Sequence, residues 1–377
     1  MQGNSIREKV ITLFAKYPYL KKYLNENNDL LVESQKRKLS RYLSGEFSKV
    51  DLQDSLRFLS EILYKHFQRE VYILIDEYDA TVNDIYSKNT YLKLEPKELN
   101  DILDLFGTML GAVLKGNPYL KKGILTGILR ITKVSLFSDV NNVTEYNLLG
   151  DRFTEYYGFT QDEVDELLAK VPTITNPQLI KDWYNGYKFG GQVVYNPWSI
   201  MCCLSEGGIL DYHWINSGGT DLIDQVLLSD DVQPDLQTLL NGQSINRKLY
   251  KKITLDQIQV DREIFYSLLV FAGYLNPKKI NIDPEDLWYK LTIPNKEVRK
   301  IYKDRVIQWV VDKLKIEPND YDNFVNLFLE QKIKEFEDKL NLYLLNASSF
   351  FQTGKRKAEA FYSGLMLGLV NILIQFT

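Results

Sequence analysis

The feature that most constrains the fold is a short apolar run that ends in acids. Residues Val71–Ile75 are all apolar or aromatic, and Asp76, Glu77 and Asp79 come next. A run of this length, rich in β-branched residues, is typical of a strand buried on both faces. Acids at the carboxyl end of such a strand lie where ligands bind in open α/β sheets. The sequence therefore predicts an α/β sheet with a polar site at one edge.

An apolar strand followed by Asp-Glu also has the form of a Walker B motif. In that motif the Asp, here Asp76, holds Mg²⁺, usually through water, and the Glu, here Glu77, orients the attacking water. The pattern is short, and a buried strand followed by two acids with no function would have the same sequence pattern. Both interpretations stay open on this stretch alone.

A second buried strand is predicted at residues 123–127, after a helix. Strand, helix and strand at this spacing form a right-handed parallel crossover, which brings both strand ends to one edge of a sheet. Thr126 would then lie beside Asp76 and Glu77, with Arg130 just beyond them. A polar residue there can sense a γ-phosphate, and an arginine can stabilise transferred charge. The alternative is an ordinary strand threonine and a solvated arginine.

Apolar periodicity predicts helices through most of the remaining chain. The main helical stretches are predicted within residues 5–68, at 97–115 and over 322–345. Asp51 is expected to cap the helix that follows it, and Thr160 and Asn295 to begin two others. A β-hairpin is predicted near 274–293. From residue 155 onwards the chain is therefore expected to be mainly helical.

Composition excludes several classes of site. The net charge is −4 and the pI about 5.5, so any nucleic-acid contact has to use a local basic patch. The two cysteines, Cys202 and Cys203, are adjacent, which rules out paired-cysteine zinc spacings and suits a reducing cytosol. His66 and His213 are far apart, which argues against a histidine metal site. Residues 1–10 carry charges and no apolar core, so no signal peptide is expected and the protein is predicted to be cytoplasmic.

Several motifs together resemble the bacterial and archaeal AAA-ATPase-like proteins that carry a PD-(D/E)XK nuclease domain. The matching stretches, in order, are Ile75–Asp79, Leu125–Arg130, Ser135–Asn142, Trp183–Tyr187, Tyr195–Ser199, Gly273–Leu275, Ile293–Val298 and Phe361–Gly364. The ordered set is more specific than any one of its members. The aromatic stretch Trp183–Tyr187 could bind a base or a peptide, or it could anchor a helical subdomain.

The resemblance implies a P-loop-type parallel sheet, with Mg²⁺ and ATP as cofactors. It implies that Asp76 coordinates Mg²⁺, Glu77 activates water, Thr126 contacts the nucleotide and Arg130 stabilises charge. It also implies four regions. They are an ATPase-like α/β domain (1–155), a helical lid-like subdomain (156–245), a helical and β-hairpin linker (246–345) and the start of a nuclease-like domain (346–377).

The chain departs from this family at both ends. The family's phosphate-binding loop, Gly-x-x-x-x-Gly-Lys-Ser/Thr, should precede the first strand, yet only Gly3 and Gly45 occur before residue 71. After Glu359 there is no Asp or Glu, so a nuclease metal site is not encoded there. We therefore expect a chain truncated at both ends, from a split or decayed gene or as a fragment.

These departures shape the expected function. The chain is a P-loop ATPase by resemblance, expected to be inactive alone and to expose an apolar surface where the absent strand would pack. The alternatives are a protein-interaction module, or half of a split ATPase-nuclease whose partner is a separately encoded P-loop or nuclease fragment. Full-length relatives could act on nucleic acid. Residues 360–377 are uncharged, but Ser363, Asn371 and Gln375 argue against a membrane span.

Overall fold

The computed structural model describes most of the chain and divides it into two compact units. The described residues are 2–25, 27–79, 96–127, 142–171, 176–214, 232–251, 262–280, 287–346, 362 and 364–366. Unit 1 comprises 1–145 and 251–257, and unit 2 comprises 146–250 and 258–377. The division into four regions predicted above stays a prediction.

Unit 1 begins with helices, as the periodicity predicts. They are α1 (Gln2–Ala15), η1 (Pro18–Leu24), α2 (Glu33–Ser44) and α3 (Lys49–Phe67). The rings of Phe14 and Tyr42, both fully buried, stack with centroids 4.5 Å apart and join α1 to α2. The cap of α3 is Ser48 and not Asp51 as predicted. Asp51 occupies the third helical position and completes a capping box, because its carboxylate accepts from the Ser48 N–H.

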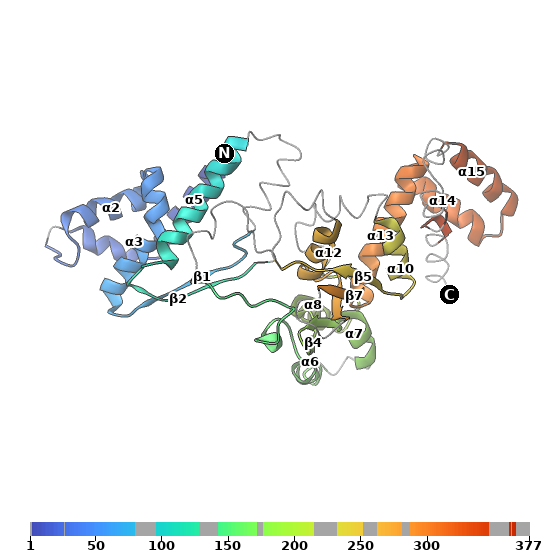
Figure 1. Ribbon diagram of the computed structural model, residues 1–377, viewed down its shortest axis with the longest axis horizontal. Helices are drawn as coiled ribbons and strands as arrows, with labels where there is room; N and C mark the ends of the chain where they lie inside the picture. The colour runs from blue at the N-terminus through green and yellow to red at the C-terminus, as the bar shows by residue number, and fades with distance from the viewer. Residues whose placement is uncertain are drawn as a thin grey trace. The chain divides into compact units, whose positions relative to one another are not determined.

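A parallel pair of strands forms the sheet of unit 1 (Figure 1). The strand β1 (Val71–Ile75) pairs with β2 (Leu120–Leu125), and α5 (Pro96–Leu114) lies between them in sequence and packs on α3. The parallel crossover is confirmed, although β2 starts at Leu120 and not at 123. Its first residues include exposed Lys121 and Lys122. The prediction assumed a fully buried strand, so it left these two lysines out.

The prediction that β1 is buried on both faces is wrong for the described part of the chain. Helices α3 and α5 contact one face of the pair, where Val71, Ile73 and Ile75 are half-buried. On the other face Tyr72 is 59% exposed, Leu74 is 72% exposed and Ile124 is 45% exposed. The side chains of Tyr72, Leu74 and Ile124 on this face are therefore largely exposed.

Unit 2 opens with short helices around a hairpin. Its first elements are η2 (Thr154–Tyr156), α6 (Gln161–Leu168), α7 (Pro177–Tyr184), β3 (Tyr187–Phe189), β4 (Gln192–Val194) and α8 (Pro197–Ser205). The predicted capping box at the start of α6 is present, with the Thr160 side chain accepting from the Glu163 N–H. The buried side chains of Val164, Tyr184 and Ile200 belong to one core cluster that joins the three helices.

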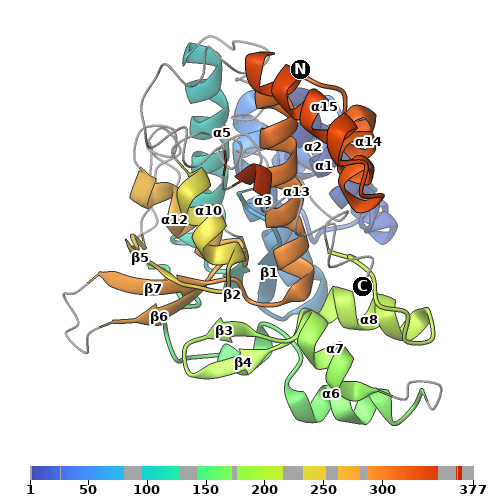
Figure 2. The same cartoon turned by 90° about the vertical axis from the view of Figure 1, so that its right-hand side faces the viewer.

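A three-stranded antiparallel sheet follows, with α10 (Gln233–Leu240) and α12 (Arg262–Phe271) on one side of it (Figure 2). Its strands are β5 (Ile245–Lys248), β6 (Asn276–Lys279) and β7 (Trp288–Thr292), in the spatial order β5-β7-β6. The hairpin predicted near 274–293 is confirmed as β6 and β7. The third strand, β5, was not predicted.

Three helices complete the described part of unit 2: α13 (Lys296–Leu314), α14 (Pro318–Leu329) and α15 (Ile333–Asn346). Asn295 caps α13 as predicted, since its side chain accepts from the Val298 N–H. The single helix predicted over 322–345 is wrong. Gln331 has φ +58°, and the Lys332 N–H bonds back to the Leu327 carbonyl, which ends α14 and lets α15 fold against it.

Other fold predictions are supported only in their coarse form. The chain mixes helix and sheet, but the parallel sheet has two strands in the described residues, so a P-loop-type arrangement stays a prediction. Of the predicted nuclease-like start at 346–377, only residues 346, 362 and 364–366 are described. No helix in the described ranges combines the length and apolarity that crossing a bilayer requires.

Candidate functional site

The ends of β1 and β2 bring three of the predicted site residues together. The register pairs Ile75 with Leu125, and the Thr126 N–H donates to the Ile75 carbonyl at 2.9 Å. The Tyr78 N–H in turn donates to the Thr126 carbonyl at 2.9 Å. The chain after β1 is therefore held against the chain after β2. Asp76 and Glu77 lie at the sheet edge that the parallel crossover predicts.

The Asp76 carboxylate accepts two hydrogen bonds at this edge of the sheet. Its Oδ1 accepts a hydrogen bond from the Thr126 hydroxyl and another, 3.1 Å long, from the Glu77 N–H. The Glu77 N–H also lies 3.3 Å from Thr126 Oγ1. Both carboxylates and the threonine are exposed, so a ligand can reach them. Glu77 has φ +48°, a conformation that is uncommon for a non-glycine residue and that recurs at ligand sites.

Gly127 allows the turn after β1 to pack closely against the end of β2. A Cβ on Gly127 would lie 2.7 Å from the Asp79 carboxylate and 2.7 Å from the Tyr78 ring. Asp79 is only 2% exposed, so its carboxylate packs inside this turn and does not face solvent. Sequence reasoning noted Asp79 as a third acid and missed Gly127, since only the folded turn reveals the contact.

The donor set fits a hydrated Mg²⁺ with phosphate ligands better than a metal held by protein alone. Within the described part of the chain, no group of three His, Cys, Asp or Glu side chains could hold a metal ion. Mg²⁺ commonly binds through one or two carboxylates, several waters and substrate phosphates. Asp76 offers such a carboxylate at an exposed edge. Arg130, the fourth predicted residue, lies outside the described residues.

A second polar centre, not predicted from the sequence, is buried in unit 2. Glu297, in the first turn of α13, is fully buried. Its carboxylate accepts from the Ser199 hydroxyl at 2.8 Å and from the Trp214 N–H at 2.7 Å. Burial raises the pKa of Glu297, although these two donors and nearby His213 oppose the rise. The carboxylate thus ties α8, the 213–214 segment and α13 together.

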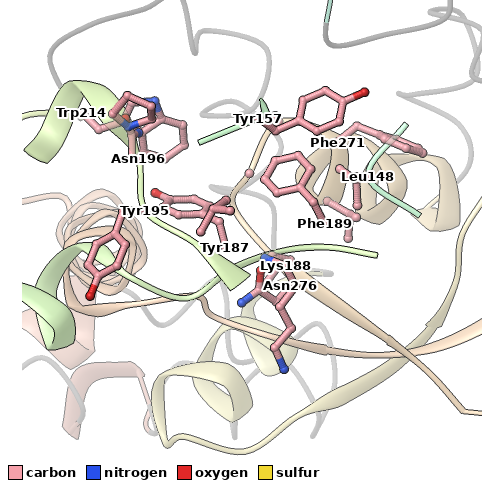
Figure 3. A pocket seen from close by; sticks show the side chains of 16 residues that line it. Leu148, Tyr157, Tyr187, Lys188, Phe189, Tyr195, Asn196, Trp214, Phe271 and Asn276 are labelled. Carbon is pink, nitrogen blue, oxygen red and sulfur yellow. Dashed lines mark hydrogen bonds between the residues drawn. The ribbon is translucent and has the colours of Figure 1, made fainter. Parts of the chain in front are cut away.

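An aromatic pocket of about 230 Å³ lies beside the β3–β4 hairpin in unit 2 (Figure 3). The rings of Tyr157 and Phe189 stack in one wall with centroids 4.9 Å apart and an interplanar angle of 6°. Tyr187 and Trp214 line another part. The Tyr187 hydroxyl is buried near the amides of Asn295 and Asn196 and makes no hydrogen bond of ordinary geometry with them. The Trp183–Tyr187 stretch therefore anchors the subdomain and also borders a cavity.

Residues 11–137 match the family model described as "Predicted AAA-ATPase". This part of the chain is similar to AAA-ATPase-like proteins. The matched range contains Asp76, Glu77, Thr126 and Arg130, so the strand-end site lies wholly inside it. The match supports the resemblance inferred from the motifs in this range, and it does not extend to the nuclease-like part.

One curated relative covers more of the chain. It is described as an uncharacterized protein in the vnfD 5' region of Azotobacter chroococcum mcd 1 and is 26% identical over 231 residues. The match covers 61% of this chain and 41% of the relative, so the chain spans about two fifths of that protein's length. No solved structure gives a significant match.

Proposed function

We propose that unit 1 supplies the Walker B edge of an AAA-type nucleotide-binding module. Asp76 holds a hydrated Mg²⁺, Glu77 orients the attacking water, and Thr126 faces the γ-phosphate, with Arg130 beyond it. The single observation that carries the proposal is the shared acceptor at Asp76. Thr126 and the Glu77 backbone both donate to its Oδ1, which fixes the relative position of the three residues. The AAA-ATPase-like family match over this range supports nucleotide binding in general.

The residues of this chain do three things in that proposal. The Thr126 hydroxyl and the Glu77 N–H hold the Asp76 carboxylate in one orientation, so a cation at this edge meets a fixed ligand. Exposed Glu77 accepts a hydrogen bond from water and aligns it. Gly127 and buried Asp79 let the turn after β1 pack closely against the end of β2. Mg²⁺, when bound, supplies charge neutralisation at the phosphates.

We further propose that this chain does not turn over ATP alone. The Gly-x-x-x-x-Gly-Lys-Ser/Thr loop is not in its sequence, and that loop provides the backbone N–H groups and the lysine that hold the phosphates. For comparison, losing a single oxyanion-hole donor in another enzyme costs about 100- to 1,000-fold in rate, and here several phosphate contacts are absent together. A separately encoded P-loop fragment would be the partner that completes the site, and coupling to a nuclease domain stays part of the same proposal.

The exposed sheet face favours one alternative, a protein-interaction module. Tyr72, Leu74 and Ile124 present an apolar surface beside the strand-end site, although parallel sheets are ordinarily covered on both faces. In this alternative the sheet binds a partner protein and the acids are not used for hydrolysis. Both functions predict that a partner stabilises unit 1, and they differ in whether nucleotide is required.

The test combines calorimetry with a phosphate-release assay on the purified chain. Mg²⁺–ATP is titrated into the wild type, Glu77→Gln and Asp76→Asn, with and without a fragment that carries a phosphate-binding loop. We expect no micromolar ATP binding by the chain alone. Turnover that appears with the fragment and is lost in Glu77→Gln supports the ATPase proposal. Partner binding that is equally tight with and without ATP, and in both variants, supports the interaction module. Turnover by the chain alone contradicts the proposed dependence on a partner.

A further inference from the structure

The exposed face of the β5-β7-β6 sheet concentrates positive charge. The register places Lys278 directly opposite Lys290, with Asn246 on the other side of Lys290. All three side chains are exposed, and they share one face because cross-strand partners point to the same side of a sheet. The opposite face carries buried Ile245 and Leu291, toward α10 and α12. The lysine face is therefore the one that solvent covers.

An aromatic ring lies in the next row of the same face. Trp288, two residues before Lys290, is 41% exposed and pairs with Lys248, and the Lys248 ammonium lies 5.4 Å from the centroid of its ring. Ile280, two residues after Lys278, is 45% exposed. The face thus joins an accessible indole ring to three lysines. We call this set (Asn246, Lys248, Lys278, Ile280, Trp288 and Lys290) the basic sheet face.

The charge arrangement costs stability in the free protein. Like charges directly opposite each other on neighbouring strands are destabilising. Among the described residues, Lys278 and Lys290 form no ion pair that would offset the repulsion. Lysine on an edge strand commonly protects that edge from pairing, but Lys290 lies on the central strand β7. Edge protection therefore does not account for the repulsion between the two lysines. An anionic ligand would remove that repulsion.

Neighbouring elements leave the face accessible. Asn276, at the start of β6, accepts from the Lys188 N–H at 3.1 Å, so the β3–β4 hairpin covers only that end of the face. The side chain of Glu263 accepts from the Lys248 N–H and belongs to α12, on the opposite side of the sheet. The β6–β7 connection lies outside the described residues, so only the strand residues define the face.

We propose that the basic sheet face binds single-stranded nucleic acid. Lysines contact the phosphates, and the exposed Trp288 ring stacks on a base, the combination used by proteins that bind single strands without sequence preference. The pI of about 5.5 makes such binding local, since the protein as a whole carries a net charge of −4. The proposal does not depend on nucleotide binding in unit 1.

Fluorescence anisotropy on the full chain tests it, with labelled oligo-dT and oligo-U of 20 nucleotides and a duplex of the same length. We expect micromolar binding of single strands at low salt and weaker binding of the duplex. In the Lys278→Gln/Lys290→Gln variant, the slope of log K against log salt should be less steep than in the wild type, its magnitude falling by about 1.4. Trp288→Ala should weaken binding at least about fivefold, and Trp288→Phe should restore most of it.

The matched control is Lys9→Gln/Lys16→Gln, which removes the same charge from two exposed positions, one on α1 and one directly after its end. It should bind as the wild type does. Equal binding by the two double variants, or no binding by the wild type, overturns the proposal. Preference for phosphatidylserine vesicles over oligonucleotides, lost in Trp288→Ala, also overturns it in favour of a membrane surface.

Discussion

Gly186 lies directly against Pro294, although more than a hundred residues separate them in sequence. A Cβ on Gly186 would come within 2.3 Å of the Pro294 carbonyl oxygen, and Gly186 has φ +114°. The Gly186 carbonyl also accepts from the Asn276 side chain, which in turn accepts from the Lys188 N–H. Three segments of unit 2 that are far apart in sequence therefore meet at one backbone position.

Gly186→Ala should destabilise unit 2 by more than about 2 kcal/mol, because both the backbone conformation and the contact with Pro294 exclude a side chain. All the tryptophans (Trp183, Trp198, Trp214, Trp288 and Trp309) lie in unit 2, so their fluorescence during urea unfolding reports this unit. Gly191→Ala is the control, since nothing lies within 4 Å of its Cβ. Equal effects of the two substitutions would contradict the close approach.

Gly127→Ala should destabilise the strand-end turn of unit 1 by about 1–3 kcal/mol, because the new methyl group overlaps Asp79 and Tyr78. Gly111→Ala, in helix α5 with open space around it, should instead stabilise unit 1 by about 0.5–1 kcal/mol. Hydrogen exchange of peptides from β1 and β2 measures both changes. Slower exchange in Gly127→Ala would show that the turn has room for a side chain.

Asp51 should make unit 1 sensitive to acid. Burial alone would raise its pKa, but hydrogen bonds from Arg41 and Ser48 lower it to about 2, below the ordinary value of 3.8. The ionised form is the one the fold favours, so this stabilisation is complete above pH 4 and is lost as the pH falls toward 2. We expect about 1–2 kcal/mol at neutral pH, allowing for solvent around Arg41.

Circular dichroism during acid titration measures the effect, with Asp51→Asn beside the wild type. The variant should lose stability at neutral pH and show a shallower acid transition between pH 4 and 2. Asp29→Asn changes an exposed carboxylate and serves as the control. Identical acid transitions in wild type and Asp51→Asn would refute the contribution of ionised Asp51 to stability.

Glu297 predicts the opposite pH dependence in unit 2. Burial raises its pKa, so the fold favours the protonated carboxyl, and its contribution is complete below the ordinary value of 4.5 and falls as the pH rises through the raised pKa. Glu297→Gln keeps an oxygen acceptor and cannot ionise. Relative to the wild type, it should gain stability as the pH rises from about 4.5 to 8. Tryptophan fluorescence in urea at a series of pH values measures the difference, and a pH-independent difference contradicts the assignment.

Sequence reasoning located the strand-end site because a parallel crossover fixes which strand ends meet. Asp76 and Thr126 were predicted to be neighbours on that ground alone, and the structure joins them by a hydrogen bond. Glu297 was noted only within a motif, because an acid in the first turn of a helix is ordinary and nothing local shows its burial. Its role depends on Ser199 and Trp214, which lie 83 or more residues away in sequence.

Helix boundaries failed where backbone conformation decided them. Gln331 takes a left-handed conformation with no glycine or proline nearby to mark it, so the apolar pattern predicted one helix through the turn. The strand β5 was missed because Ile245 is its one apolar residue and polar Asn246, Arg247 and Lys248 follow in a row, which leaves no alternating pattern. The basic sheet face could have been suspected from Lys278 and Lys290 only once the pairing of β6 with β7 was known.

The acids after β1 also oppose self-association of the protein, which affects every variant of this site. Val71–Ile75 is an uncharged, β-prone segment with an exposed face, the kind of sequence that pairs with copies of itself. Glu70 on one side and Asp76 on the other place negative charges at both ends of it, as gatekeeper residues do. Neutralising Asp76 therefore removes a safeguard against self-association as well as the proposed metal ligand. Light scattering has to accompany each binding measurement on Asp76→Asn, so that lost solubility is not mistaken for lost affinity.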